Sequence, residues 1–167
     1  MYSLYVNYLA RELIMGLKEE LSLSKDFIST EHEALLNLYY TTICLKKRAA
    51  GFFAPYGLTG VQFNLMMMLK HHGGGEGLSQ ARLSEMMMVN RANITGLIDR
   101  LEKAGMVQRT AAEDRRYNMI QLTSKGEKLL EKADTTYGKE VQQVMSVLGE
   151  PDLKRLIKAC EKIRENL

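Results

Sequence analysis

The stretch SQARLSEMMMVNRANITGLIDRLEKAGMVQRTAAEDRRYNMIQLT, residues 79–123, decides the fold. Its second part repeats apolar side chains at i, i+3, i+4 and i+7, which is the spacing of one helix face. These side chains are Ile94, Leu97, Ile98 and Leu101. Two strand-like runs follow, on either side of the charged tip EDRR at 113–116. The stretch therefore predicts a short helix, a turn, a longer helix and a hairpin.

Residues that favour helix ends mark the boundaries of these elements. Ser79 and Asn90 stand where the N-caps of the short and the longer helix are expected, and Gly105 stands where a glycine ends the longer one. The short helix is expected to run through QARLSEMMM. Upstream, Thr59 and Gln62 have the spacing of a capping box, which opens a helix through VQFNLMMMLKHH.

Helices are also expected on both sides of this region. Apolar residues keep near-helical spacing over 4–21 and again over 30–50, where the breakers of GFFAPYGLTG begin. Downstream, Ser124 and Glu127 are expected to cap a long helix, and Pro151 fits the first turn of a last one. These terminal helices look too apolar for a monomer, so dimerisation is expected to be part of folding.

The order of the elements is that of a winged helix-turn-helix. The expected fold is mainly α with a small β-hairpin wing, flanked by N- and C-terminal dimerisation helices. The expected division is N-terminal helices over 1–57, a winged helix-turn-helix DNA-binding domain over 58–123 and C-terminal helices over 124–167. In the longer helix Ala92 and Gly96 are small, so this helix can enter a major groove that bulky aliphatic side chains would block.

The distribution of charge agrees with a central part of the chain that faces an anion. The whole chain carries a net charge of +3. Residues 35–78 and 79–125 each carry a net +3, whereas residues 1–34 carry −3 and residues 126–167 carry none. The pattern indicates a module that faces an anion, flanked by helices with another role.

Over residues 58–127 the chain resembles the DNA-binding core of the MarR family of bacterial regulators. The likeness rests on NITGLIDRLEKAGMV, on the D-x-R of Asp114 and Arg116, on LTSKG, and upstream on LTGVQFNLMMML. It implies an obligate homodimer with interlocking terminal helices and major-groove reading by residues 91–103. It also implies that Arg116 reaches the minor groove, with Asp114 orienting it or a neighbouring basic side chain. The segment before residue 30 departs from the family and is expected to be an extra helix of the dimer interface; a partner-binding arm, or a segment that hides the ligand pocket, stays open.

The residues expected to contact DNA lie on the longer helix and at the tip of the wing. They are Asn90, Arg91, Ala92, Asn93, Thr95 and Arg100 on the helix, with Asp114, Arg115 and Arg116 on the wing. Asp99 and Glu102 are acidic and are expected to form salt bridges within the protein. For the wing, the alternative is an ordinary solvated turn.

The resemblance further implies a small aromatic or anionic effector, bound between the dimer helices and the DNA-binding lobes. The candidate lining residues are Tyr39, Tyr40, Phe52, Phe53, Tyr56 and Met67. For each of them, ordinary core or interface packing is the alternative. A ligand would act by favouring dimer geometries in which the two reading helices no longer match successive major grooves.

No metal site, cofactor or catalytic site is expected. His71 and His72 are adjacent and point apart on a helix end, and neither H-x-x-x-H nor C-x-x-C spacing occurs. No nucleophile–base motif, phosphate-binding loop or paired-carboxylate pattern indicates an enzyme. Cys44 and Cys160 are interpreted as buried apolar residues, with oxidant sensing as the alternative.

The sequence therefore predicts a cytoplasmic, homodimeric, ligand-responsive repressor that binds an inverted repeat in double-stranded DNA. A membrane role is not expected, since no apolar run approaches the roughly 20 residues that span a bilayer and the first residues lack the features of a secretory leader. The alternative is a winged-helix module for protein contacts, whose DNA affinity would be weak and little affected by salt.

Overall fold

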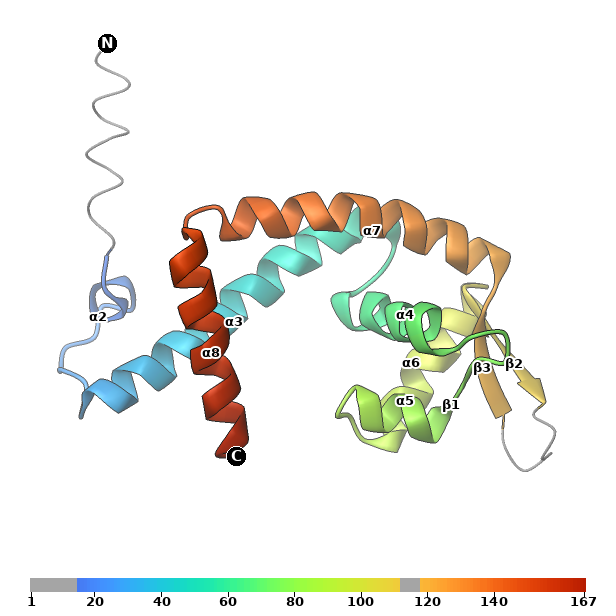
Figure 1. The fold of residues 1–167 in the computed structure, drawn as a ribbon, viewed down its shortest axis with the longest axis horizontal. Coiled ribbons are helices and arrows are strands. Elements are labelled where there is room, and N and C mark those ends of the chain that lie inside the picture. The colour runs from blue at the N-terminus through green and yellow to red at the C-terminus, as the bar shows by residue number, and fades with distance from the viewer. Residues whose placement is uncertain (1–14, 112–117) are drawn as a thin grey trace, which may run out of the picture. The chain divides into compact units, whose positions relative to one another are not determined.

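The computed structural model describes residues 15–111 and 118–167. They divide into two compact units, one that ends at Phe52 and one that spans Phe53–Leu167. The described chain is mainly helical and contains a small antiparallel sheet of three strands (Figure 1). The predicted fold class is confirmed.

The first unit contains α2 (Leu17–Glu20) and almost all of α3 (Thr30–Phe53). Of the helix predicted over 4–21, residues 1–14 lie outside the described residues, and the described part is helical only in α2. The role predicted for this segment at a dimer interface stays a prediction.

The helix break predicted at Gly51 is wrong, because α3 continues through Gly51 to Phe53. A glycine inside a helix costs only about 1 kcal/mol, and burial of the Phe53 ring, which is 2% exposed, outweighs that cost. The chain turns in the 3-10 helix η1 (Ala54–Tyr56) and then at Gly57, whose φ of +65° favours glycine.

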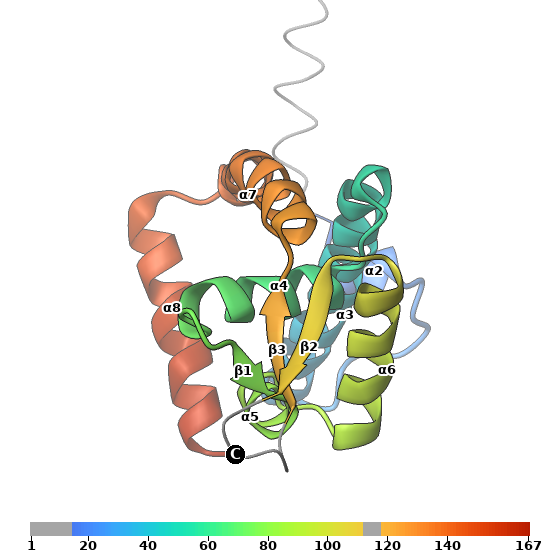
Figure 2. The ribbon, with the colours of Figure 1, turned by 90° about the vertical axis from the view of Figure 1, so that its right-hand side faces the viewer.

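The second unit holds the remaining elements. In chain order they are α4 (Gly60–His72), β1 (Leu78–Ser79), α5 (Gln80–Met86), α6 (Arg91–Lys103), β2 (Val107–Ala111), β3 (Asn118–Leu122), α7 (Ser124–Met145) and α8 (Glu150–Glu165). Figure 2 shows the three strands side by side with β3 in the middle, which is the order of their pairing.

Strand β1 is an addition to the predicted hairpin. Its two residues pair with β3, Leu78 with Ile120 and Ser79 with Met119. Two residues cannot display the alternation of a strand, and the pairing partners lie far away in sequence. The hairpin itself is confirmed, with Val107 opposite Leu122 and Ala111 opposite Asn118.

Most predicted helix caps are confirmed. Thr59 and Gln62 form the capping box of α4, the Ser79 hydroxyl accepts from the Arg82 N–H at 3.2 Å, and the longer helix ends before Gly105, which has φ +71°. Helix α5 is shorter than predicted: it ends at Met86, and Met88 takes the left-handed backbone conformation that begins the turn.

The cap predicted for α7 at Ser124 is wrong; Thr123 is the N-cap and Ser124 is already helical. The Thr123 hydroxyl accepts from the Gly126 N–H at 3.0 Å and donates to the Gly105 carbonyl at 2.7 Å. A Cβ on Gly126 would lie 2.0 Å from the carbonyl oxygen of Met106, so only glycine fits there. The LTSKG motif thus ties the start of α7 to the end of α6.

The core of the second unit is built from side chains of α4, α5, α6 and α7 and of strands β2 and β3. The largest fully buried ones are Phe63, Leu65, Met66, Leu83, Ile94, Ile98, Leu101, Ile120, Leu130 and Val107. The apolar face predicted for α6 is confirmed, since all four of its residues are buried. An aromatic cluster, defined as Phe53, Phe63 and Tyr137, joins the end of α3 to α4 and α7, with ring centroids 4.7 to 5.5 Å apart.

Candidate nucleic-acid interface

Helix α6 buries one face and exposes the other. Its predicted contact residues Arg91, Ala92, Asn93 and Arg100 are all exposed, and so is Lys103. Asn90 caps the helix, because its Oδ1 accepts from the Asn93 N–H at 2.9 Å. The structure therefore brings small, amide and cationic side chains together on one open helix face, a composition that suits a DNA groove.

Thr95 differs from its neighbours because its hydroxyl is already engaged within the protein. The hydroxyl donates to the backbone carbonyl of Arg91 at 2.8 Å. It also accepts a hydrogen bond from the side-chain amide of Gln80 in α5. Thr95 is half-buried, so it is less available to DNA than the residues around it.

An ionic cluster joins α6 to the wing. Arg109 of β2 pairs with Asp99 at 2.5 Å and with Glu102. The prediction that these two acids form salt bridges within the protein is confirmed. The hydrogen bond with Asp99, helped by the charges of both acids, raises the pKa of Arg109 above its ordinary value.

Arg109 is a residue that the sequence analysis missed. It lies two positions after the buried Val107, and so on the same face of β2. A basic residue on the inward face of a strand, following a helix that carries two acids, is the pattern that points to it. The cluster fixes the base of the wing against α6.

The tip of the wing lies outside the described residues. Asp114, Arg115 and Arg116 fall between Ala111 and Asn118, which pair with each other at the ends of β2 and β3. Their predicted contacts with DNA stay predictions.

The candidate effector-lining residues fall in both units. Tyr39, Tyr40 and Phe52 belong to the first unit, and Phe53, Tyr56 and Met67 belong to the second. Phe53 is packed into the aromatic cluster, whereas Tyr39 is 62% exposed. The neighbouring carboxylate of Glu20 raises the pKa of Tyr40. Tyr40, Phe52, Tyr56 and Met67 are half-buried.

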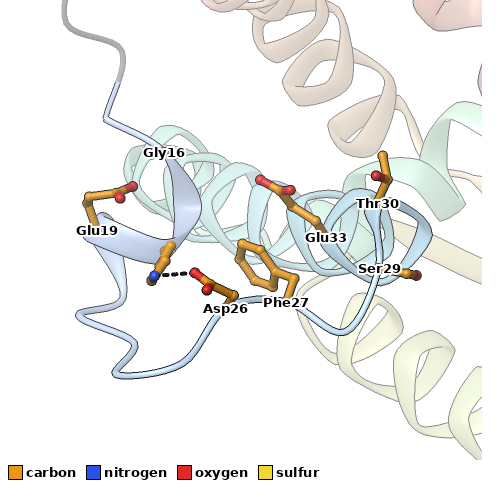
Figure 3. A pocket seen from close by; sticks show the side chains of 8 residues that line it. Gly16, Glu19, Asp26, Phe27, Ser29, Thr30 and Glu33 are labelled. Atoms are coloured by element: carbon orange, nitrogen blue, oxygen red, sulfur yellow. Dashed lines mark hydrogen bonds and ion pairs between the residues drawn. The ribbon is translucent and has the colours of Figure 1, made fainter.

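A separate hollow of about 450 Å³ lies in the first unit, where α2 and the following loop meet the start of α3 (Figure 3). In Figure 3 the ring of Phe27 stands between Asp26 and Glu33. A hydrogen bond from Lys18 holds the pKa of Asp26 below its ordinary value. None of the candidate effector-lining residues lines this hollow.

The remaining chemistry-bearing residues are dispersed. Cys44 lies on an open face of α3 and is exposed, so the prediction that it is buried is wrong. Cys160 is half-buried. Within residues 15–111 and 118–167, no three His, Cys, Asp or Glu side chains gather as metal ligands. No helix in the described part of the chain is long and apolar enough to cross a membrane.

Comparisons with known proteins agree with this fold. The family model described as the MarR family matches residues 56–116. The chain is similar to the HTH-type transcriptional regulator PecS of Dickeya dadantii (strain 3937), with 27% identity over 116 residues, 69% of this chain and 70% of PecS.

Two solved structures show the same fold at low identity. AbsC, a MarR family transcriptional regulator from Streptomyces coelicolor, matches 85% of this chain and 97% of its own with a TM-score of 0.76 and 22% identity. The S. aureus MepR–DNA complex matches 79% of this chain and 96% of its own with a TM-score of 0.74 and 21% identity.

Proposed function

The chain belongs to the MarR family of winged helix-turn-helix, DNA-binding transcriptional regulators, and we propose that it acts as a homodimeric, ligand-responsive repressor. The observation that carries the proposal is the face of α6, where Arg91, Asn93 and Arg100 are exposed above a fully apolar buried face. Members of this family are regulators of transcription and not enzymes.

Residues 58–123 form the DNA-binding domain in this proposal, with α6 in the major groove. Arg91 opens the helix and contacts a backbone phosphate, while Asn93 and Ala92 face base edges. Asn90 and Arg100 add contacts at the ends of this face. The wing, with Asp114, Arg115 and Arg116, lies along the neighbouring minor groove, where narrow A·T-rich sequence attracts arginine.

The helices within residues 1–57 and 124–167 form the dimer interface through their exposed apolar side chains. No residue of α8 is buried within the protomer, although Leu156, Ile157 and Ile163 share one side of this helix. In α3 the side chains of Leu35, Leu38 and Ile43 are likewise exposed. A second copy of the chain covers these apolar surfaces, and the dimer then presents two reading helices to half-sites about one helical turn apart.

A small aromatic or anionic effector weakens DNA binding in this proposal. It binds near Tyr39, Tyr40, Phe52, Phe53, Tyr56 and Met67 and favours a dimer in which the reading helices are wrongly spaced. A preference of a few kcal/mol for that state is enough to change operator occupancy strongly.

The repressor role is tested by transcription in vitro from a template whose promoter overlaps an inverted repeat bound by the protein. The protein is expected to lower transcript yield, and benzoate, a simple aromatic anion, is expected to restore it. Benzyl alcohol is the neutral control. A rise in transcript on adding the protein would identify an activator, and an equal response to both compounds would argue against anion recognition.

Arg116→Ala is expected to weaken DNA binding by about 1–3 kcal/mol, most at sites with A·T-rich flanks, because the minor-groove contact is lost. Titration of labelled duplexes with rich and poor A·T flanks measures the effect. Arg155→Ala is the control, since Arg155 is exposed on α8 and pairs with Asp152. If Arg116→Ala binds each duplex as tightly as the wild type does, the wing is not part of the DNA interface.

Asn93→Ala is expected to relax base preference more than it lowers affinity for unrelated duplexes. The amide side chain can make two hydrogen bonds to one base, which are together worth about 1–3 kcal/mol of discrimination. Binding to a set of single-base operator variants measures the preference. Asn64→Ala, at an exposed position of α4, serves as the control. An unaltered preference would place the reading residues elsewhere on α6.

A further inference from the structure

Gln80 and Thr95 form a hydrogen-bonded pair between the two helices of the helix-turn-helix. Gln80 is the first residue of α5 and follows β1 directly, where pairing of Ser79 with Met119 fixes the backbone. Its side-chain Nε2 donates a hydrogen bond to the Oγ1 of Thr95 in α6. Both residues are half-buried, so the pair lies at the surface where α5 begins beside the reading helix.

The Thr95 hydroxyl has little capacity left for DNA. A hydroxyl carries one hydrogen and two acceptor positions. The hydrogen is directed at the carbonyl oxygen of Arg91 at 2.8 Å, and Gln80 occupies one acceptor position. Thr95 therefore has no hydrogen to donate to a phosphate oxygen or to the acceptor atoms of bases.

Gln80 has the capacity that Thr95 lacks. Its amide has two N–H groups and one carbonyl oxygen. The bond to Thr95 uses one N–H, and the described residues provide no hydrogen-bond partner for the other N–H. The bond to Thr95 also fixes the orientation of the amide, which reduces the entropy lost when a ligand binds to it.

We propose that Gln80 donates its second N–H to a phosphate of the DNA backbone, and that Thr95 is the positioning residue that orients it. The proposal rests on the proposed reading of DNA by α6. In a helix-turn-helix the first helix crosses the backbone while the second lies in the major groove. A residue at the start of α5 that contacts α6 is therefore positioned to donate a hydrogen bond to the DNA backbone. The same contact would set how deeply α6 enters the major groove.

The test is a double-mutant cycle on the full-length homodimer, with Gln80→Ala, Thr95→Val and both changes together. The probes are the duplex that the wild type enriches from a random pool and a scrambled duplex of equal length. Thr135→Val is the matched control, because the Thr135 hydroxyl makes the same bond to a carbonyl four residues earlier, that of Glu131, at 2.9 Å. Thr95→Ser, which keeps the hydroxyl, is the conservative variant, and thermal unfolding checks that each protein folds.

Gln80→Ala is expected to weaken binding of the dimer about a hundredfold, because one hydrogen bond to a charged acceptor, worth about tenfold, is lost at each of the two half-sites. Thr95→Val should cause a loss of similar size, and the double variant should be no worse than either, because the two residues act as one unit. Thr95→Ser and Thr135→Val should bind like the wild type. The salt dependence should not change, since a neutral amide releases no counterion, and both duplexes should lose affinity equally.

Two results overturn the phosphate contact. One is that Gln80→Ala binds both duplexes as tightly as the wild type does. The other is a Thr95→Val variant with altered base preference beside a Gln80→Ala variant with none, which would make Thr95 itself the reader. Failure of the wild type to bind either duplex overturns the proposed function as a whole, and the phosphate contact with it.

Discussion

Ile157→Glu is expected to convert the proposed dimer to monomers and to lower affinity for an inverted repeat by on the order of a hundredfold or more. Ile157 lies on the apolar side of α8 and is 57% exposed in the protomer. In a dimer its side chain is covered, and a carboxylate there would be buried without a partner, which is strongly unfavourable. A monomer holds only one copy of α6 and, in the proposed function, loses the advantage of binding two half-sites at once.

The measurements are molar mass by light scattering during size-exclusion chromatography, and titration of duplexes with one or two half-sites. The control is Lys158→Glu, which introduces the same side chain at an exposed position on the opposite side of α8 and should leave the dimer intact. If Ile157→Glu stays dimeric and binds the inverted repeat like the wild type, α8 does not form the interface. Monomers that keep full affinity would instead separate dimerisation from DNA binding.

Phe63→Ala is expected to lower the free energy of unfolding by about 3–5 kcal/mol, the usual cost of emptying a buried aromatic site. Phe63 is 2% exposed, and its ring packs against Phe53 at 4.7 Å and Tyr137 at 5.1 Å between centroids. The cavity would therefore open at the point where α3, α4 and α7 meet.

Denaturant unfolding at fixed protein concentration measures the loss, since the stability of a dimer depends on concentration. Val61→Ala on the same helix is the control; Val61 is 46% exposed, so its truncation should change stability by no more than about 0.5 kcal/mol. A loss for Phe63→Ala as small as that of the control would mean that the aromatic cluster does not support the fold.

The features that the sequence predicts well are those determined by local pattern. The buried face of α6 follows from four apolar residues at helical spacing, and its N-cap follows from the preference of Asn90 for that position. The capping box of α4 needs only Thr59 and Gln62. In each case the residues that determine the structure are within one or two helical turns of one another.

The features that the sequence misses depend on contacts between distant residues. Strand β1 exists because β3 pairs with Leu78 and Ser79. The helix α3 passes Gly51 because burial of Phe53 outweighs the local preference for a break. No pattern within α7 shows that Thr123, rather than Ser124, caps the helix. The Thr123 hydroxyl also donates a hydrogen bond to the carbonyl of Gly105, just after the end of α6, and this contact joins residues that are distant in sequence.

The candidate site divides in the same way. That α6 carries exposed polar and basic residues could be predicted from its helical periodicity. That Asp99 and Glu102 each form a salt bridge within the protein could be predicted from their charge, although their partner Arg109 could not be named. The engagement of Thr95 by Gln80 could not, because it depends on how α5 packs against α6.

The most direct test of sequence-specific binding is selection of bound duplexes from a random DNA pool by the purified protein at near-physiological salt. The proposed function predicts enrichment of an inverted repeat whose half-sites lie about one helical turn apart. It also predicts that affinity for the enriched duplex falls steeply as salt rises. A pool that stays random, with binding that is weak and little affected by salt, would contradict the proposed function and favour a winged-helix module for protein contacts.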